Sequence, residues 1–188
     1  MGAIYRREMN SFFSSSIAYV FLSVFFLFSG YFFLAGTLMS ATTDMSEMFS
    51  ALFLIVLILI PVLTMKLLSE EKKQKTDQGL LTAPVSLWSI VLGKYFAALT
   101  LYIIGISIVF IYALILSYFG TVVWATVVAN YLALILLGSA FISVGTFVSS
   151  MTENQMSSAA ASFLVLMLLY MIDSIATLFD NEFIKDAL

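Results

Sequence analysis

The sequence predicts an all-α fold: a polytopic bundle of transmembrane helices, with five spans that follow an N-terminal interfacial amphipathic helix. The chain has 188 residues, of which 62% are hydrophobic and 10% charged, whereas soluble domains have about 45–50% and about 25%. The apolar residues fall in five continuous runs, each about as long as the 20-residue helix that crosses a bilayer. Because these runs show no alternation of apolar and polar residues, they argue against a β-barrel. We therefore treat residues 1–188 as one transmembrane domain.

Residues 1–16 predict an amphipathic helix that lies along the membrane surface. Arg6 and Arg7 fall on its polar arc. Helical spacing gathers the apolar side chains on the other face, at Ile4, Tyr5, Met9, Phe12 and Phe13. A frayed polar start of the chain is the alternative to this helix.

The spans are expected at residues 17–39, 49–68, 95–119, 127–148 and 157–179. Pro61 should kink the second span, since proline has no amide hydrogen. Acceptor side chains predict two helix starts, at Asp44-x-x-Glu47 and in a capping box at Thr152-x-x-Gln155.

Small residues are concentrated in the last two spans. They predict close helix packing, because small side chains let helices approach in lipid. They are Gly138, Ser139, Ser143 and Gly145 in the fourth span, and residues 157–162 in the fifth.

The distribution of basic residues predicts the orientation. Arg6, Arg7 and the five lysines of residues 66–94 fall on one side of the five spans, and Lys185 falls on the other. By the positive-inside rule, the N-terminus and residues 66–94 are cytoplasmic and the C-terminus is extracytoplasmic. We expect a multi-pass protein of the cell's inner (cytoplasmic) membrane.

Composition excludes several kinds of site. The net charge of −3 gives no reason to expect nucleic-acid binding. With no cysteine and no histidine, thiolate chemistry and the commonest metal ligand are missing. A phosphate-binding loop at Gly93-Lys94 fails, because it needs glycine where Trp88 stands and serine or threonine where Tyr95 stands. We therefore predict no catalytic, cofactor-binding or metal-binding residue, and expect Lys94 to snorkel to the headgroups.

Residues 66–94 form the one long polar passage of the chain. They contain an acidic and basic helix extension (SEEKKQK), a turn-like TDQG, an apolar LLTAPV and Ser86, which can cap a following helix. An apolar patch flanked by charges is typical of a docking surface. A loop that only fixes topology explains the charges equally well, and the residue types alone do not decide between the two.

Several short strings occur in order along the chain. They are Arg7-Glu8 with FSSSIAYV (residues 13–20), IPVLTMK (60–66), Glu70-Glu71-Lys72, LLTAPVS (80–86) with IVLGK (90–94), and SSMTENQ (149–155). Together they resemble the membrane (permease) subunits of type-2 ATP-binding-cassette (ABC) exporters, in particular the gliding-motility-associated branch. Three features depart from that pattern: Ser16 stands where proline is frequent, residues 75–79 differ, and the family's sixth span is absent.

The resemblance implies a function without catalysis. The chain would be the permease subunit of an ATP-driven exporter, working as a dimer with a second copy or a homologue, while a separate ABC ATPase subunit binds ATP. Residues 66–94 would be the coupling segment for that ATPase. The implied contacts are Glu70, Glu71, Lys72, Leu80, Leu81, Thr82, Pro84 and Gly93, with Thr152, Glu153 and Asn154 as a second patch.

Two other functions remain open from the sequence. A non-transporting membrane assembly or immunity factor would bind a different cytosolic partner through the same loop. An ion-coupled transporter would need ionisable groups inside its spans, and Asp173 near the outer end of the fifth span is the only acid within one.

Overall fold

The computed structural model describes residues 1–74 and 86–182, with side chains at 1–73 and 86–172. Within these ranges most residues are helical and none belongs to a strand, which confirms the predicted all-α class. The elements are α1 (Gly2–Ser14), α2 (Ser16–Phe32), the π-helix η1 (Phe33–Leu38), α3 (Ser46–Thr64), α4 (Ser69–Gln74), α6 (Leu87–Ile106), α7 (Ile108–Ser117), α8 (Trp124–Met151) and α9 (Gln155–Glu182).

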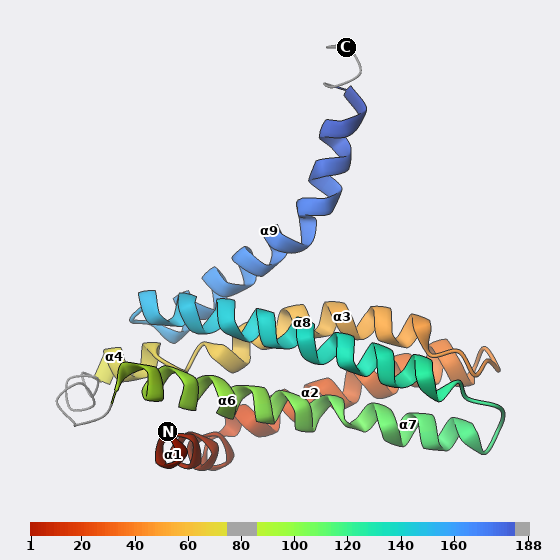
Figure 1. The fold of residues 1–188 in the computed structure, drawn as a ribbon, viewed down its shortest axis with the longest axis horizontal. Coiled ribbons are helices and arrows are strands. Elements are labelled where there is room, and N and C mark those ends of the chain that lie inside the picture. The colour runs from red at the N-terminus through yellow and green to blue at the C-terminus, as the bar shows by residue number, and fades with distance from the viewer. Residues whose placement is uncertain (75–85, 183–188) are drawn as a thin grey trace.

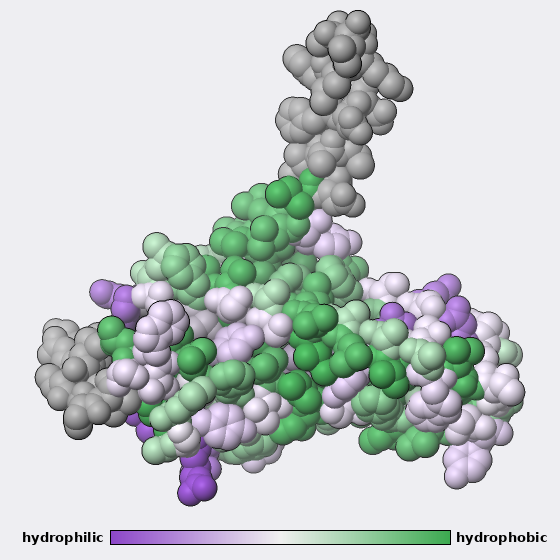
Figure 2. Space-filling model, viewed as in Figure 1, coloured by the Kyte–Doolittle hydropathy of each residue, from purple (hydrophilic) through white to green (hydrophobic). Residues whose placement is uncertain are grey.

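Five helical stretches are long and apolar enough to cross a membrane. They are Ser16–Leu38, Ser46–Lys73, Leu87–Ser117, Trp124–Met151 and Gln155–Ile172. Their hydrophobic residues cover much of the middle of the bundle, while the most hydrophilic side chains on the face shown in Figure 2 gather toward its two ends. The predicted polytopic bundle is therefore confirmed.

The helices of the bundle run side by side along its long axis (Figure 1). The stretch Leu87–Ser117 consists of α6 and α7, with a break at Ser107, whose hydroxyl contacts the Ile103 carbonyl at 2.7 Å and the Tyr131 hydroxyl at 3.1 Å. Helix α9 starts against α8 and α3 and then leaves the bundle at an angle (Figure 1).

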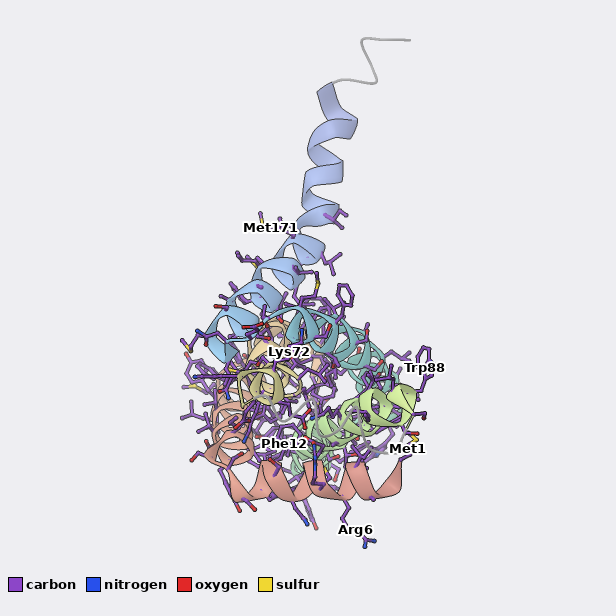
Figure 3. The ribbon with its side chains drawn as sticks, turned by 90° about the vertical axis from the view of Figure 1, so that its left-hand side faces the viewer. Met1, Arg6, Phe12, Lys72, Trp88 and Met171 are labelled. Atoms are coloured by element: carbon purple, nitrogen blue, oxygen red, sulfur yellow. The ribbon has the colours of Figure 1, made fainter. Side chains whose placement is uncertain are left out.

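Helix α1 lies across one end of the bundle, roughly at right angles to the spans (Figure 3). Phe12 points from α1 toward the bundle and is buried, whereas Arg6 points away from it. Two details differ from the predicted apolar face. Phe13 is exposed, and the charged Glu8 is buried in the α1 contact instead.

Helix α3 forms the centre of the bundle. In the most apolar 18-residue segment of the stretch Ser46–Lys73, 61% is buried inside the bundle, against at most 44% in the other four stretches. Helix α8 packs closely against α3 and α6 at two glycines, as the small residues predicted. A Cβ at Gly145 would lie 2.3 Å from Thr64 Oγ1, and a Cβ at Gly138 would lie 2.2 Å from Tyr102 Cε1.

The helix cap predicted at Ser86 is confirmed: the helix that leads into the third span begins at Leu87, and the Ser86 hydroxyl accepts the Ser89 N–H. The capping box at Thr152 and Gln155 is wrong. Helix α9 is capped by Asn154, whose side-chain oxygen accepts the Met156 N–H at 3.1 Å.

The helix extension SEEKKQ is confirmed as α4. The start of α3 is also close to the prediction. It begins at Ser46, where the Asp44 carboxylate accepts the Ser46 N–H at 3.0 Å.

Candidate functional site

One end of the bundle carries all the basic side chains of the part that the structure describes. This end, which we call the basic end, is formed by α1, α4, the first turns of α6 and the junction of α8 with α9 (Figure 1). The residues are Arg6, Arg7, Lys66, Lys72, Lys73 and Lys94. The basic residues that the sequence placed on one side of the membrane therefore also lie together at one end of the bundle.

Lys94 lies at the centre of the basic end, and its side chain is only 2% exposed. Its ammonium nitrogen is 3.1 Å from Glu8 Oε1 on α1 and 3.1 Å from Glu71 Oε1 on α4. A lysine in this position is held by two carboxylates and does not extend to the lipid headgroups. The snorkelling prediction for Lys94 is therefore wrong, because partners within the protein keep its charge buried.

Arg7 completes a cluster of two cations and two carboxylates. Its guanidinium is 2.8 Å from Glu8 Oε1 and 2.5 Å from Glu71 Oε1. The hydrogen bond that Arg7 donates to Glu8 raises the pKa of Arg7, and Glu71 acts in the same direction, while partial burial opposes both. We call Arg7, Glu8, Glu71 and Lys94 the charge cluster. It joins α1, α4 and α6.

Gly93, one of the predicted coupling residues, lies under α1. A Cβ there would be 2.9 Å from Ile4 Cγ2, closer than real Cβ contacts, and 3.2 Å from Ile4 Cβ, which is also tight. Tyr5 adds a hydrogen bond from its hydroxyl to Thr100 Oγ1 at 3.1 Å. Gly93 therefore lets α1 pack onto α6 beside the charge cluster.

Hydrogen bonds at the end of α8 fix the connection between α3 and α4. The Ser149 hydroxyl oxygen accepts the N–H groups of Leu68 and Ser69, at 3.1 and 3.2 Å. The Lys72 ammonium donates to the Ser150 carbonyl. Because these bonds satisfy backbone groups in the turn before α4, they hold α4 against α8.

The second predicted patch follows directly from this contact. Thr152 donates to the Val148 carbonyl at 3.4 Å, while Glu153 and Asn154 are exposed in the turn between α8 and α9. Helix α4 contacts both α8 and α9. The structure thus brings the described part of the first patch next to the second.

The predicted site residues are only partly covered by this description. Glu70 is 3.3 Å from Lys66 Nζ, one helical turn away. The predicted contacts Leu80, Leu81, Thr82 and Pro84 lie outside the described residues.

The sequence reasoning missed Ser149 and the pairing of Glu8 with Lys94. The signal for the pairing was present. Glu8 falls on the same helical arc as Ile4 and Phe12, so an acid stood on an apolar face and needed a partner.

A cavity of about 330 Å³ opens between α1, the turn after α3, α4 and α6. Its lining includes three cations, Arg7, Lys66 and Lys94, and three carboxylates, Glu8, Glu70 and Glu71. Ser11, Phe12 and Leu67 complete the wall. Among the described residues, no group of three or more Asp or Glu side chains is placed to hold a metal ion. The arrangement links α4 mechanically to α1, α6 and α8.

Comparison with known proteins gives one match. A family model described as "ABC-2 family transporter protein" matches residues 3–182. No curated protein and no solved structure matches the chain.

Proposed function

The chain belongs to the ABC-2 family of transporter proteins, and from this premise we propose that it is the permease subunit of an ATP-driven exporter, coupled to a separate ATPase at its basic end. Its family and its five apolar helices make it a multi-pass membrane component of an ABC transporter. Permeases of this family are non-catalytic membrane subunits, so ATP would be bound and hydrolysed by the partner.

One observation carries the coupling proposal: the residues of the first patch on α4, Glu70 to Lys72, lie beside the second patch at the basic end. The second patch is the turn from Thr152 to Asn154, between the two helices that α4 contacts. An ATPase that docks there would contact both at once. Residues 66–94 and this turn would then be cytoplasmic, as the positive-inside rule predicts for the inner membrane.

The contacts of α4 support a route for the coupling. A displacement of α4 would act on α8 through Ser149 and on α1 and α6 through Glu71. Glu71 and Gly93 are therefore proposed as positioning residues inside the permease, and the exposed Glu153 as a contact of the ATPase. If these helices have two stable packing arrangements, the change from one to the other would open the transport pathway to one side of the membrane and close it to the other.

Two finer assignments belong to the same proposal. The ordered strings from Arg7-Glu8 to SSMTENQ support the gliding-motility-associated branch of the family. A functional unit of two permeases, either two copies or a copy and a homologue, with paired ATPases follows from the same resemblance.

The experiment is co-purification of the full chain with the ABC ATPase of its own organism, followed by ATPase assays in lipid nanodiscs. Glu153→Lys reverses an exposed charge at the proposed contact and should reduce the retained ATPase several-fold, because rim charges control association. Glu47→Lys makes the same charge reversal at the opposite end of the bundle and should leave retention unchanged.

Glu71→Gln tests the positioning role separately. It should leave the ATPase bound but reduce the effect of the permease on ATP hydrolysis, because α4 loses its carboxylate link to α1 and α6. Failure of the ATPase to co-purify with the wild-type chain, or equal loss with Glu153→Lys and Glu47→Lys, would contradict the proposal.

A further inference from the structure

A groove lies at the end of the bundle opposite to the basic end, between α3, α8 and α9. It consists of two adjoining cavities, of about 540 Å³ and about 140 Å³. Ser46, Phe49 and Asn130 line both cavities. The two therefore form one groove, with a larger inner part and a smaller part beside the connector to α3.

Asn130 is the feature of this groove that the packing leaves unexplained. It lies within the apolar stretch Trp124–Met151 and is half-buried. Its side-chain amide makes no hydrogen bond with any residue that the structure describes. A primary amide in hydrocarbon is costly without a polar partner. Because Asn130 faces both cavities, a molecule in the groove is the natural partner.

The larger cavity has an apolar and aromatic wall. Phe49, Phe53 and Tyr170 line it, with Leu134 and Leu137. The rings of Phe53 and Tyr170 lie 5.5 Å apart between centroids, although they come from α3 and α9. The Ser50 hydroxyl already donates to the Ser46 carbonyl at 3.0 Å. This part of the groove therefore suits an apolar or aromatic body.

The smaller cavity has a carboxylate at its edge. Asp44 lines it and is exposed. Its Oδ1 atom accepts the N–H and the hydroxyl of Ser46, at 3.0 and 2.6 Å. These bonds lower the pKa of Asp44, so it is ionised at neutral pH. Its second oxygen makes no hydrogen bond within the described residues.

In the part of the chain that the structure describes, the charged side chains at this end of the bundle are all negative. All described lysines and arginines are at the basic end, while Asp44 and Glu47 are here. A cationic group is therefore favoured at the smaller cavity, and an anionic group is disfavoured.

We propose that this groove binds an amphiphilic organic cation, with its aromatic body against the wall formed by Phe49, Phe53 and Tyr170 and its charged head near Asp44 and Asn130. The proposal names a substrate class and so rests on the proposed export function. Binding to the groove requires no ATPase, however, and is measured on the permease alone.

The test uses tetraphenylphosphonium, a permanent cation with an aromatic shell, and its anionic counterpart tetraphenylborate. The full chain is placed in phosphatidylcholine nanodiscs, and binding is measured by equilibrium dialysis against empty nanodiscs. The wild type should bind the cation saturably and show no saturable binding of the borate.

Asp44→Asn should weaken cation binding by about fivefold, the factor supplied by unit charges about 4 Å apart in water. Glu47→Gln is the matched control: it removes one negative charge three residues away, from a residue that lines neither cavity, and should reduce the affinity much less than Asp44→Asn does. Asn130→Leu should also weaken binding, because the amide dipole beside the positive charge is lost, while Asn130→Gln, which keeps the amide, should retain part of it.

Three results would overturn the proposal. One is equal binding of the phosphonium and the borate, and another is equal loss of affinity in Asp44→Asn and Glu47→Gln. The third concerns Asn130→Leu. If this variant loses cation binding and also changes from a dimer to a monomer on size-exclusion chromatography, Asn130 would contact a second copy of the chain and not a ligand. If the ATPase couples normally while these variants bind like the wild type, the groove proposal fails alone. If the cation binds as expected and no ATPase couples, the export proposal fails instead.

Discussion

At the basic end Lys94 has two carboxylate oxygens at 3.1 Å, whereas at the opposite end the amide of Asn130 has no hydrogen-bond partner among the described residues. Both are polar side chains on helices long enough to cross a membrane. The first is held in place by its own protein, and the second is left available. This difference is the basis of our two proposals, that the first end transmits force to the bundle and that the second receives a ligand.

Replacing Lys94 should produce the largest effect on stability. Lys94→Met leaves Glu8 and Glu71 partly buried without the lysine charge that compensates them. Removing one partner of a buried ion pair costs about 3–5 kcal/mol. The melting temperature in detergent, followed by size-exclusion chromatography of heated samples, should fall sharply.

A combined variant separates the lost pairing from lost packing. Lys94→Met with Glu8→Gln and Glu71→Gln removes the two carboxylates that lose the lysine and leaves only Arg7, whose side chain is 50% exposed, so it should recover part of the melting temperature. If the triple variant were no more stable than Lys94→Met, burial of charge would not explain the loss. The charge cluster would then differ little from an ordinary polar surface.

The middle of the bundle gives a contact that is close but uncharged. A Cβ at Gly138 would lie 2.2 Å from the ring of Tyr102, which is fully buried and donates its hydroxyl hydrogen to the Leu134 carbonyl at 2.7 Å. Gly138→Ala should therefore destabilise the protein by about 1–3 kcal/mol through overpacking.

Gly30→Ala is the matched control, also within a helix. Its Cβ would be 3.6 Å from the Tyr112 hydroxyl, an ordinary contact. We expect the melting temperature to be unchanged or slightly raised, because alanine favours helix more than glycine does. Equal losses at both positions would mean that the close approach of α8 to α6 does not set the cost.

Ser149 tests how firmly α4 is held at the basic end. Ser149→Ala removes the acceptor for the N–H groups of Leu68 and Ser69 and should cost about 1–2 kcal/mol. Hydrogen exchange of the turn at residues 65–68, measured by mass spectrometry, should increase more than exchange elsewhere. Ser143→Ala removes a hydroxyl that only bonds back to the Ala140 carbonyl and should leave this exchange unchanged.

The helices of this fold could be predicted because their cause is local. Continuous apolar runs of membrane-spanning length allow only a helix, and the capping serine Ser86 marks a helix start in the sequence itself. The prediction that Lys94 snorkels was wrong, because its carboxylate partners lie on other helices and no pattern in its own helix reveals them.

The site was less predictable because it depends on contacts between distant segments. Glu8 meets Lys94 across 86 positions in the chain, and Ser149 meets Leu68 across 81. No periodicity within one helix encodes such pairs. Asn130 was overlooked in the same way, since a single amide in an apolar run forms no pattern until the groove around it is seen.

The smallest expected effect is at the opposite end, where Asp44 is exposed. Its lowered pKa means that its charge stabilises the fold at a pH above its ordinary value of 3.8, and that this contribution is lost as the pH falls through the lower folded pKa. The carboxylate also lies just before α3, where the helix dipole favours a negative charge. The difference in melting temperature between the wild type and Asp44→Asn should therefore be small at pH 7 and disappear as the pH falls below the folded pKa of Asp44. In a Ser46→Ala background, which removes one of the two donors to Asp44, the difference should shrink. A difference as large as that of Lys94→Met would mean that Asp44 is a structural residue, and the contrast between the two ends of the bundle would not hold.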